Sequence, residues 1–129
     1  MPILVYRVEH IKTRLGPYQF KKGTGYPVPE MLQAHIPETH PGPMYDEGLI
    51  EHHHRGEIER HFYGFRTREE LDKWFAGFLV KLHNKGYVVR VYEVPDEDVV
   101  IGDRQVVFRR PRRVKEVHPL VRNRNLPTV

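Results

Sequence analysis

The stretch TREELDKWFAGFLVKLHNKG, residues 67–86, decides the fold. Its first four residues have the form of a capping box, in which Thr67 and Glu70 cap the start of a helix. Apolar residues then recur at helical spacing and form one stripe: Leu71, Trp74, Phe75, Phe78, Leu79 and Leu82. Gly86 suits the left-handed position that ends a helix. We therefore expect one long amphipathic helix over about residues 67–85, packed on one face of a sheet.

Runs of β-forming residues lie on both sides of this helix. Residues 3–11 alternate, further strands are predicted for 58–65, 87–94 and 105–108, and a short apolar run covers 99–101. Six of the eleven prolines fall within residues 16–44, so the 16–57 stretch is predicted to be mostly loop, with one short helix over 29–36. The fold class predicted for residues 1–108 is a single α+β domain. Its sheet is expected to be mixed but mainly antiparallel, with four or five strands.

Charge is distributed unevenly along the chain. Residues 109–129, called the basic segment below, hold six arginines, one lysine and one glutamate, whereas residues 1–108 hold 14 basic and 16 acidic side chains. The full chain has a net charge of +4, so the basic segment exceeds it at +6. Its prolines and high charge predict a flexible arm that binds an acidic partner. The binding residues expected there are Arg109, Arg110, Arg112, Arg113, Lys115, Arg122 and Arg124.

Composition excludes several classes of chemistry. The chain has neither cysteine nor serine, which removes disulfides, thiolate metal sites and the corresponding nucleophiles. With only three asparagines and three glutamines and an excess of arginine over lysine, the composition is typical of thermophile proteins. No apolar run is long enough for a membrane span or a signal peptide, so we expect a cytoplasmic protein with no membrane partner.

A histidine-rich stretch is the weak metal candidate. His52, His53 and His54 are consecutive, and consecutive residues in a loop hold no fixed ligand geometry. We therefore expect a solvated loop and no native metal or other cofactor.

Arg7 and Glu9 share a strand face with Ile3 and Val5, where they could line a cleft or lie at the rim of a sheet edge. Three parts of the chain resemble, in order, the three-part site of ADP-ribosyltransferases. They are Arg7, the step FYGFRT at residues 62–67, and Gln105 on a late strand. The resemblance implies that Arg7 holds the diphosphate or ribose of NAD. Tyr63 and Thr67 would shape the nicotinamide pocket, and Gln105 would stand where the family has a catalytic acid. The sequence departs from the family because Gln105 has no adjacent glutamate and the middle motif has no serine.

The basic segment also raises the possibility of a nucleic-acid-binding domain. Arginine pairs well with phosphate groups and with acidic protein grooves. The run RRPRR at residues 109–113 contains no aromatic side chain to stack on bases, so it indicates non-specific contact through charge.

In overall character the chain resembles small host-directed proteins of phages that infect thermophilic bacteria. The shared features are a compact α+β domain without cysteine or serine and a basic C-terminal extension. The resemblance implies a non-enzymatic transcription regulator that binds bacterial RNA polymerase at the β-flap and the σ factor, and so inhibits or redirects host transcription. We expect this function first, with an NAD-dependent ADP-ribosyltransferase-like enzyme or a basic nucleic-acid-binding domain as the alternatives.

Overall fold

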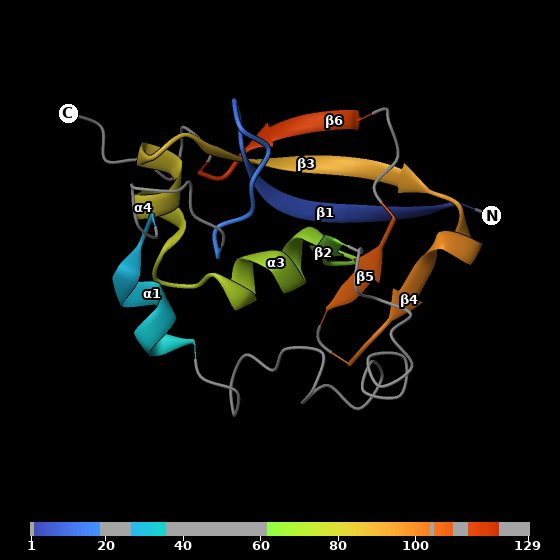
Figure 1. The fold of residues 1–129 in the computed structure, drawn as a ribbon, viewed down its shortest axis with the longest axis horizontal. Helices are drawn as coiled ribbons and strands as arrows, with labels where there is room; N and C mark the ends of the chain where they lie inside the picture. The colour runs from blue at the N-terminus through green and yellow to red at the C-terminus, as the bar shows by residue number, and fades with distance from the viewer. Residues whose placement is uncertain (1, 19–26, 36–61, 104, 110–113, 122–129) are drawn as a thin grey trace.

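The structure of the protein is a computed structural model, which describes residues 2–18, 27–35, 62–103, 105–109 and 114–121. Six strands, three α-helices and one 3-10 turn form there. Figure 1 shows how the strands and helices are arranged. In chain order they are β1 (Ile3–His10), α1 (Pro29–Ala34), β2 (Phe62–Gly64), α3 (Arg68–Trp74), α4 (Leu79–Asn84), β3 (Tyr87–Val94), η1 (Asp96–Asp98), β4 (Val99–Ile101), β5 (Val106–Phe108) and β6 (Val114–Pro119).

The strands form two antiparallel sheets of three, in the orders β1-β3-β6 and β2-β5-β4. The predicted α+β class is therefore confirmed, whereas the single sheet of four or five strands is wrong. The two sheets meet where Phe65 and Tyr6 exchange backbone hydrogen bonds of 2.8 Å. A side chain at Gly64 would come within 2.5 Å of Val5 Cγ1, so this junction requires glycine.

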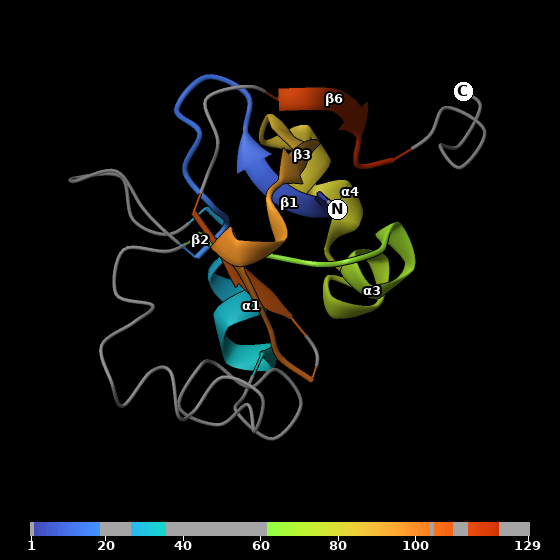
Figure 2. The ribbon, with the colours of Figure 1, turned by 90° about the vertical axis from the view of Figure 1, so that its right-hand side faces the viewer.

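The predicted long helix is also wrong, because it is broken into α3 and α4. Gly77 lies between the two helices with φ +88°, a left-handed conformation that ends regular helix. The apolar stripe nevertheless packs against one face of β1 and β3, with four of its members buried and two, Phe78 and Leu79, partly buried. Figure 2 shows α3 and α4 beside β1 and β3. Thr67 caps α3 by accepting a hydrogen bond from the Glu70 backbone N–H, as the capping box predicts.

Each face of the β1-β3-β6 sheet has its own apolar core. The helices cover the face that carries Val8, Val89 and Val91. The second sheet covers part of the other face, where Val5 and Tyr92 pack with residues that include Val106 and Phe108. Because successive strand residues point to opposite faces, the odd-numbered residues of β1 belong to this second face. Arg7 and Glu9 therefore lie beside an apolar core.

The predicted flexible arm contains a strand in its middle. Val114–Pro119 forms β6, which pairs antiparallel with β3. The strand was missed because four of its six residues are polar or proline, which hides the alternation of an edge strand. Residues 110–113 and 122–129 lie outside the described residues, as does most of the predicted loop at 16–57.

Candidate functional site

The most unusual feature of the interior is a group of charged and hydroxyl side chains between β1 and β3. Arg7, Glu9, Arg90 and Tyr92, called the buried ion cluster below, are all less than a tenth exposed, and Glu9 is completely buried. All four project from the same face of the sheet, because the strand register places Arg7 opposite Arg90. Two like charges directly opposite each other are unfavourable, so an acid between them is required.

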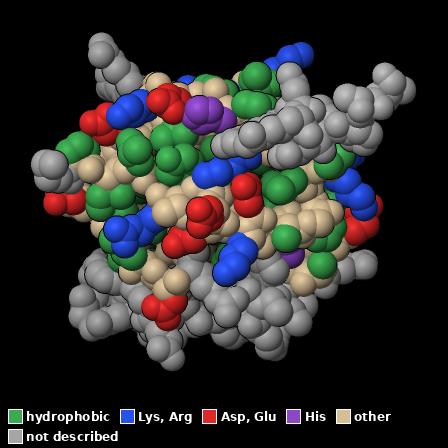
Figure 3. Space-filling view, turned by 180° about the vertical axis from the view of Figure 1, so that it is seen from behind, with side chains coloured by type: hydrophobic (Ala, Val, Ile, Leu, Met, Phe, Trp, Pro, Cys, Tyr) green, Lys and Arg blue, Asp and Glu red, His purple; other side chains and the backbone are tan. Residues whose placement is uncertain are grey.

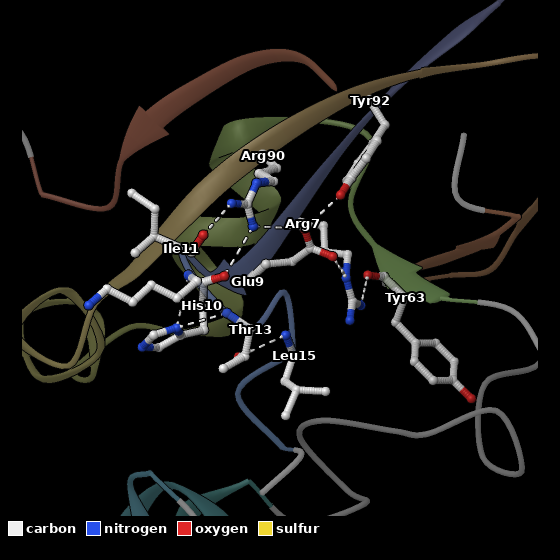
Figure 4. A network of polar contacts seen from close by, with 10 residues as sticks. Arg7, Glu9, His10, Ile11, Thr13, Leu15, Tyr63, Arg90 and Tyr92 are labelled. Atoms are coloured by element: carbon white, nitrogen blue, oxygen red, sulfur yellow. Dashed lines mark hydrogen bonds and ion pairs between the residues drawn. The ribbon is translucent and has the colours of Figure 1, made fainter. Parts of the chain in front are cut away.

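Glu9 supplies that acid. One carboxylate oxygen accepts from Arg7 Nε at 2.7 Å, and the other accepts from Tyr92 Oη at 2.6 Å and from Arg90 Nη1 at 3.2 Å (Figure 4). Three charged or polar donors thus surround one carboxylate. Short, charge-assisted hydrogen bonds of this kind offset the cost of burying the charges.

The arginines also hold neighbouring backbone. Arg90 donates from Nη1 to the His10 carbonyl at 3.1 Å and from Nη2 to the Ile11 carbonyl at 2.8 Å, so it fixes the end of β1. Arg7 Nη1 donates to the Tyr63 carbonyl at 2.9 Å, and its guanidinium lies 5.2 Å from the centre of the Phe62 ring. The buried ion cluster therefore ties β1 to β3 and to β2.

The ADP-ribosyltransferase resemblance can be compared with this geometry residue by residue. Arg7 and Tyr63 do meet, but the contact uses the Tyr63 backbone, and the Tyr63 ring points away from Arg7 (Figure 4). Partial burial raises the pKa of the Tyr63 phenol, although Tyr63 is 40% exposed. Thr67 caps α3, and Gln105 is buried in the β4–β5 turn, where its carbonyl accepts from Gly102 N–H. Because Arg7 is buried and donates to Glu9 and to the Tyr63 carbonyl, the fit of Arg7 to a diphosphate is poor.

Sequence reasoning placed Arg7 and Glu9 on one face but missed Arg90 and Tyr92. β1 is an outer strand of the β1-β3-β6 sheet, but the burial of Arg7 and Glu9 shows that neither side chain lies at a solvent-exposed rim. The missed signal was Arg90, which interrupts the otherwise apolar first half of the strand YVVRVYEV. A buried strand tolerates arginine only where an acid faces it, and Glu9 is that acid.

The expected binding residues of the basic segment lie partly inside the described residues. Lys115 Nζ is 3.6 Å from Glu93 across the β6–β3 pair, and the Arg109 backbone N–H donates to the Asp98 carbonyl at 3.1 Å. The remaining expected residues lie outside the described residues: Arg110, Arg112, Arg113, Arg122 and Arg124. On the face drawn in Figure 3, the described basic and acidic side chains are interspersed.

Among the residues that the structure describes, no three His, Asp or Glu side chains come together as a metal-binding group. His52, His53 and His54 lie outside them. Within the described part of the chain, no helix has the length and apolar character needed to cross a bilayer.

Comparison with known proteins places the chain among phage proteins. Residues 1–120 match the family described as Bacteriophage T4 Y00F protein. Over 54 residues the chain is 37% identical to the "Uncharacterized 19.7 kDa protein in motB-dexA intergenic region" of Enterobacteria phage T4. That match covers 41% of this chain and 32% of the relative, so it spans about a third of the relative's length. No solved structure matches. Because the family match extends over nearly all of the described fold, the chain belongs to the Bacteriophage T4 Y00F protein family.

Proposed function

We propose that this phage protein is a host-directed regulator that binds bacterial RNA polymerase and inhibits or redirects host transcription without catalysis. Membership of a phage family supports the host-directed part of the proposal. The polymerase, with its β-flap and σ factor as the contact surfaces, is the partner implied by the resemblance to small phage regulators.

The observation that carries the proposal is the position of β6. This strand lies inside the basic segment and joins it to the β1-β3-β6 sheet by pairing with β3. Four arginines precede β6 within five residues, and Arg122 and Arg124 follow soon after it. A net charge of +6 is therefore attached to a folded edge, an arrangement suited to steering a protein onto an acidic surface.

The buried ion cluster supports a role without catalysis. Its only carboxylate is completely buried and accepts three hydrogen bonds, so it is held as a stable anion. Its two arginines donate to that carboxylate and to backbone carbonyls. Side chains so fully engaged with one another stabilise the fold and leave little capacity for substrate.

A binding experiment tests the proposal. The tagged full-length protein is immobilised and exposed to purified RNA polymerase holoenzyme from an enterobacterium and from a thermophilic bacterium, at low and at high salt. We expect the holoenzyme to be retained at low salt and cross-links to form with the β-flap and σ. Failure to retain either holoenzyme at low salt would contradict the proposal.

The tagged full-length protein also tests the two alternative functions, a nucleic-acid-binding domain and an NAD-dependent enzyme. A nucleic-acid-binding domain predicts retention of a generic DNA duplex without polymerase, and loss of that retention when the arginines of the basic segment are replaced by glutamine. Truncation at residue 109 is unsuitable because it would also remove β6. An NAD-dependent enzyme predicts saturable NAD binding in calorimetry that Arg7→Lys weakens. Because Arg7 is buried and paired with Glu9, we expect no such binding.

A further inference from the structure

The edge of the β1-β3-β6 sheet lies inside the most basic part of the sequence. Within the described residues, β6 has a strand neighbour on one side only, which is β3. Figures 1 and 2 show β6 at the outer side of that sheet. An edge strand presents backbone N–H and C=O groups that an extended peptide can pair with. The edge therefore supplies hydrogen bonds at the place where the chain concentrates positive charge.

The sequence of β6 indicates which backbone groups face outward. Pro119 has no N–H, and proline is accommodated in an edge strand where its nitrogen faces away from the neighbouring strand. Alternate residues of a strand direct their backbone groups to the same side, so Val117 also presents its N–H and C=O to the open edge. The Val117 side chain is 52% exposed, opposite Arg90 in the register, and offers an apolar contact beside these groups.

The charged side chains on β6 are already paired with one another or with β3. Glu116 lies 2.7 Å from His118, and Lys115 lies 3.6 Å from Glu93. The strand itself therefore contributes little net charge. The excess positive charge of the basic segment comes from the arginines before and after β6: Arg109, Arg110, Arg112, Arg113, Arg122 and Arg124.

We propose that β6 accepts an acidic, extended segment of a partner protein as an added antiparallel or parallel strand. The backbone of the segment would pair with β6, an apolar side chain would lie beside Val117, and the net positive charge of the basic segment would attract its acidic residues. This proposal deepens the function proposed above, because it gives the chemistry of the partner surface and the strand that receives it.

The same strand carries features that limit unselective pairing. The register of β3 and β6 is interrupted between Val91 and Tyr92, and Lys115 lies at that irregularity. Pro119 ends the strand at the other side. Bulges, lysine and proline are the devices that protect edge strands from aggregation. Here they confine pairing to the middle of β6, so that the partner's charge contributes much of the binding free energy.

The test uses the full-length protein and a fluorescent peptide of about nine residues, one strand in length, in which valine and glutamate alternate. A second peptide has the same sequence with every other backbone amide methylated, which keeps the charge but removes hydrogen-bond donors. We expect the methylated peptide to bind at least about tenfold more weakly in fluorescence anisotropy, because each lost hydrogen bond weakens the complex. Equal binding of the two peptides would show attraction by charge alone and would overturn the proposal.

A matched pair of variants locates the site on the protein. Val117→Asp and Val80→Asp each add one negative charge at a valine that is about half exposed, on β6 and on α4 respectively. We expect Val117→Asp to weaken peptide binding about tenfold and Val80→Asp to change it less than about twofold. An equal effect of both variants would overturn the proposal. So would a concentration-dependent dimer in sedimentation that only Val117→Asp dissolves, because the edge would then belong to a second copy.

The polymerase experiment separates this proposal from the proposed function. If the peptide binds as expected but no holoenzyme is retained, the partner is wrong and the strand site stands. If holoenzyme is retained equally by the parent protein and by Val117→Asp, the function stands and the strand site is overturned.

Discussion

The buried ion cluster and the basic segment both depend on arginine, but they place its charge in opposite settings. In the cluster, two arginines enclose one carboxylate that is completely removed from solvent, and their remaining described donors are spent on backbone carbonyls. In the basic segment, six arginines and one lysine are accompanied by one acid. In this protein, arginine stabilises the fold where its charge is buried against an acid, whereas it is left in excess for a partner where basic residues far outnumber acids.

The largest expected effect comes from removing the acid of the cluster. Glu9→Gln keeps the size of the side chain but removes the carboxylate that both buried arginines contact, so we expect the free energy of unfolding to fall by about 3–5 kcal/mol. Urea denaturation followed by circular dichroism measures the loss. The control is Glu93→Gln on the same strand pair, where the acid is 49% exposed and faces Lys115. For that variant we expect a change of at most about 1 kcal/mol.

A loss of stability for Glu9→Gln no larger than that of Glu93→Gln would contradict the role assigned to the cluster. The difference in the free energy of unfolding between the two variants therefore measures how much more a buried acid stabilises the fold than an exposed one.

The second effect concerns the close approach that brings β2 to β1. Gly64→Ala would place a Cβ 2.5 Å from Val5 Cγ1 and 3.0 Å from the Tyr6 carbonyl oxygen. We expect a loss of about 2–3 kcal/mol in the same denaturation experiment, since the neighbours are packed core and backbone. The strain would also displace Tyr63, whose carbonyl accepts from Arg7.

Gly77→Ala is the matched control for this substitution. Gly77 has open space around it and only its positive φ to maintain, so we expect a smaller loss of about 1 kcal/mol. If Gly77→Ala cost as much as Gly64→Ala, backbone conformation and not close approach would dominate at both positions.

These contrasts explain how far the sequence could be read. The strands β1 and β3 and the start of α3 were predictable because alternation and the capping box are local signals. The break at Gly77 was not, because the apolar stripe continues through it and the two short helices still bury the same side chains. β6 was hidden because its stability comes from pairing with β3, whereas its own residues are mostly polar or proline.

The buried ion cluster was only half predictable. Arg7 and Glu9 are two residues apart, so alternation places them on one face. Arg90 and Tyr92 are about eighty residues away, and only the register of β1 with β3 brings them to Glu9. Long-range pairing of this kind leaves no periodic signal, although an arginine inside an apolar strand indicates that a buried acid must face it.

A third effect depends on pH and concerns Tyr18, which is outside both regions. Tyr18 Oη accepts from Trp74 Nε1 at 2.6 Å and interacts with His35 Nδ1. Burial raises the pKa of the Tyr18 phenol, so the neutral form stabilises the fold below about pH 10 and this contribution is lost as pH rises further. We expect Tyr18→Phe to cost about 1–2 kcal/mol at pH 8, through the lost hydrogen bonds.

The difference between the parent protein and Tyr18→Phe is then expected to shrink in denaturation experiments above pH 10, because only the parent loses a proton at this position. A constant difference across the alkaline range would contradict a Tyr18 that must stay neutral in the folded state.

The smallest effect on stability is expected in the basic segment, where the effect on binding is expected to be the greatest. Arg112→Gln with Arg113→Gln removes two charges just before β6 but none of its described contacts, so we expect the free energy of unfolding to change by at most about 0.5 kcal/mol. Retention of RNA polymerase, by contrast, is expected to weaken and to depend less on salt, because fewer charges attract the partner.

The control is Arg66→Gln with Lys85→Gln, which removes the same charge from exposed positions on the folded body. If both double variants weakened retention equally, net charge alone would account for binding. A stronger effect of the basic-segment variant would show that binding depends on positive charge next to β6 in the sequence and not only on net charge.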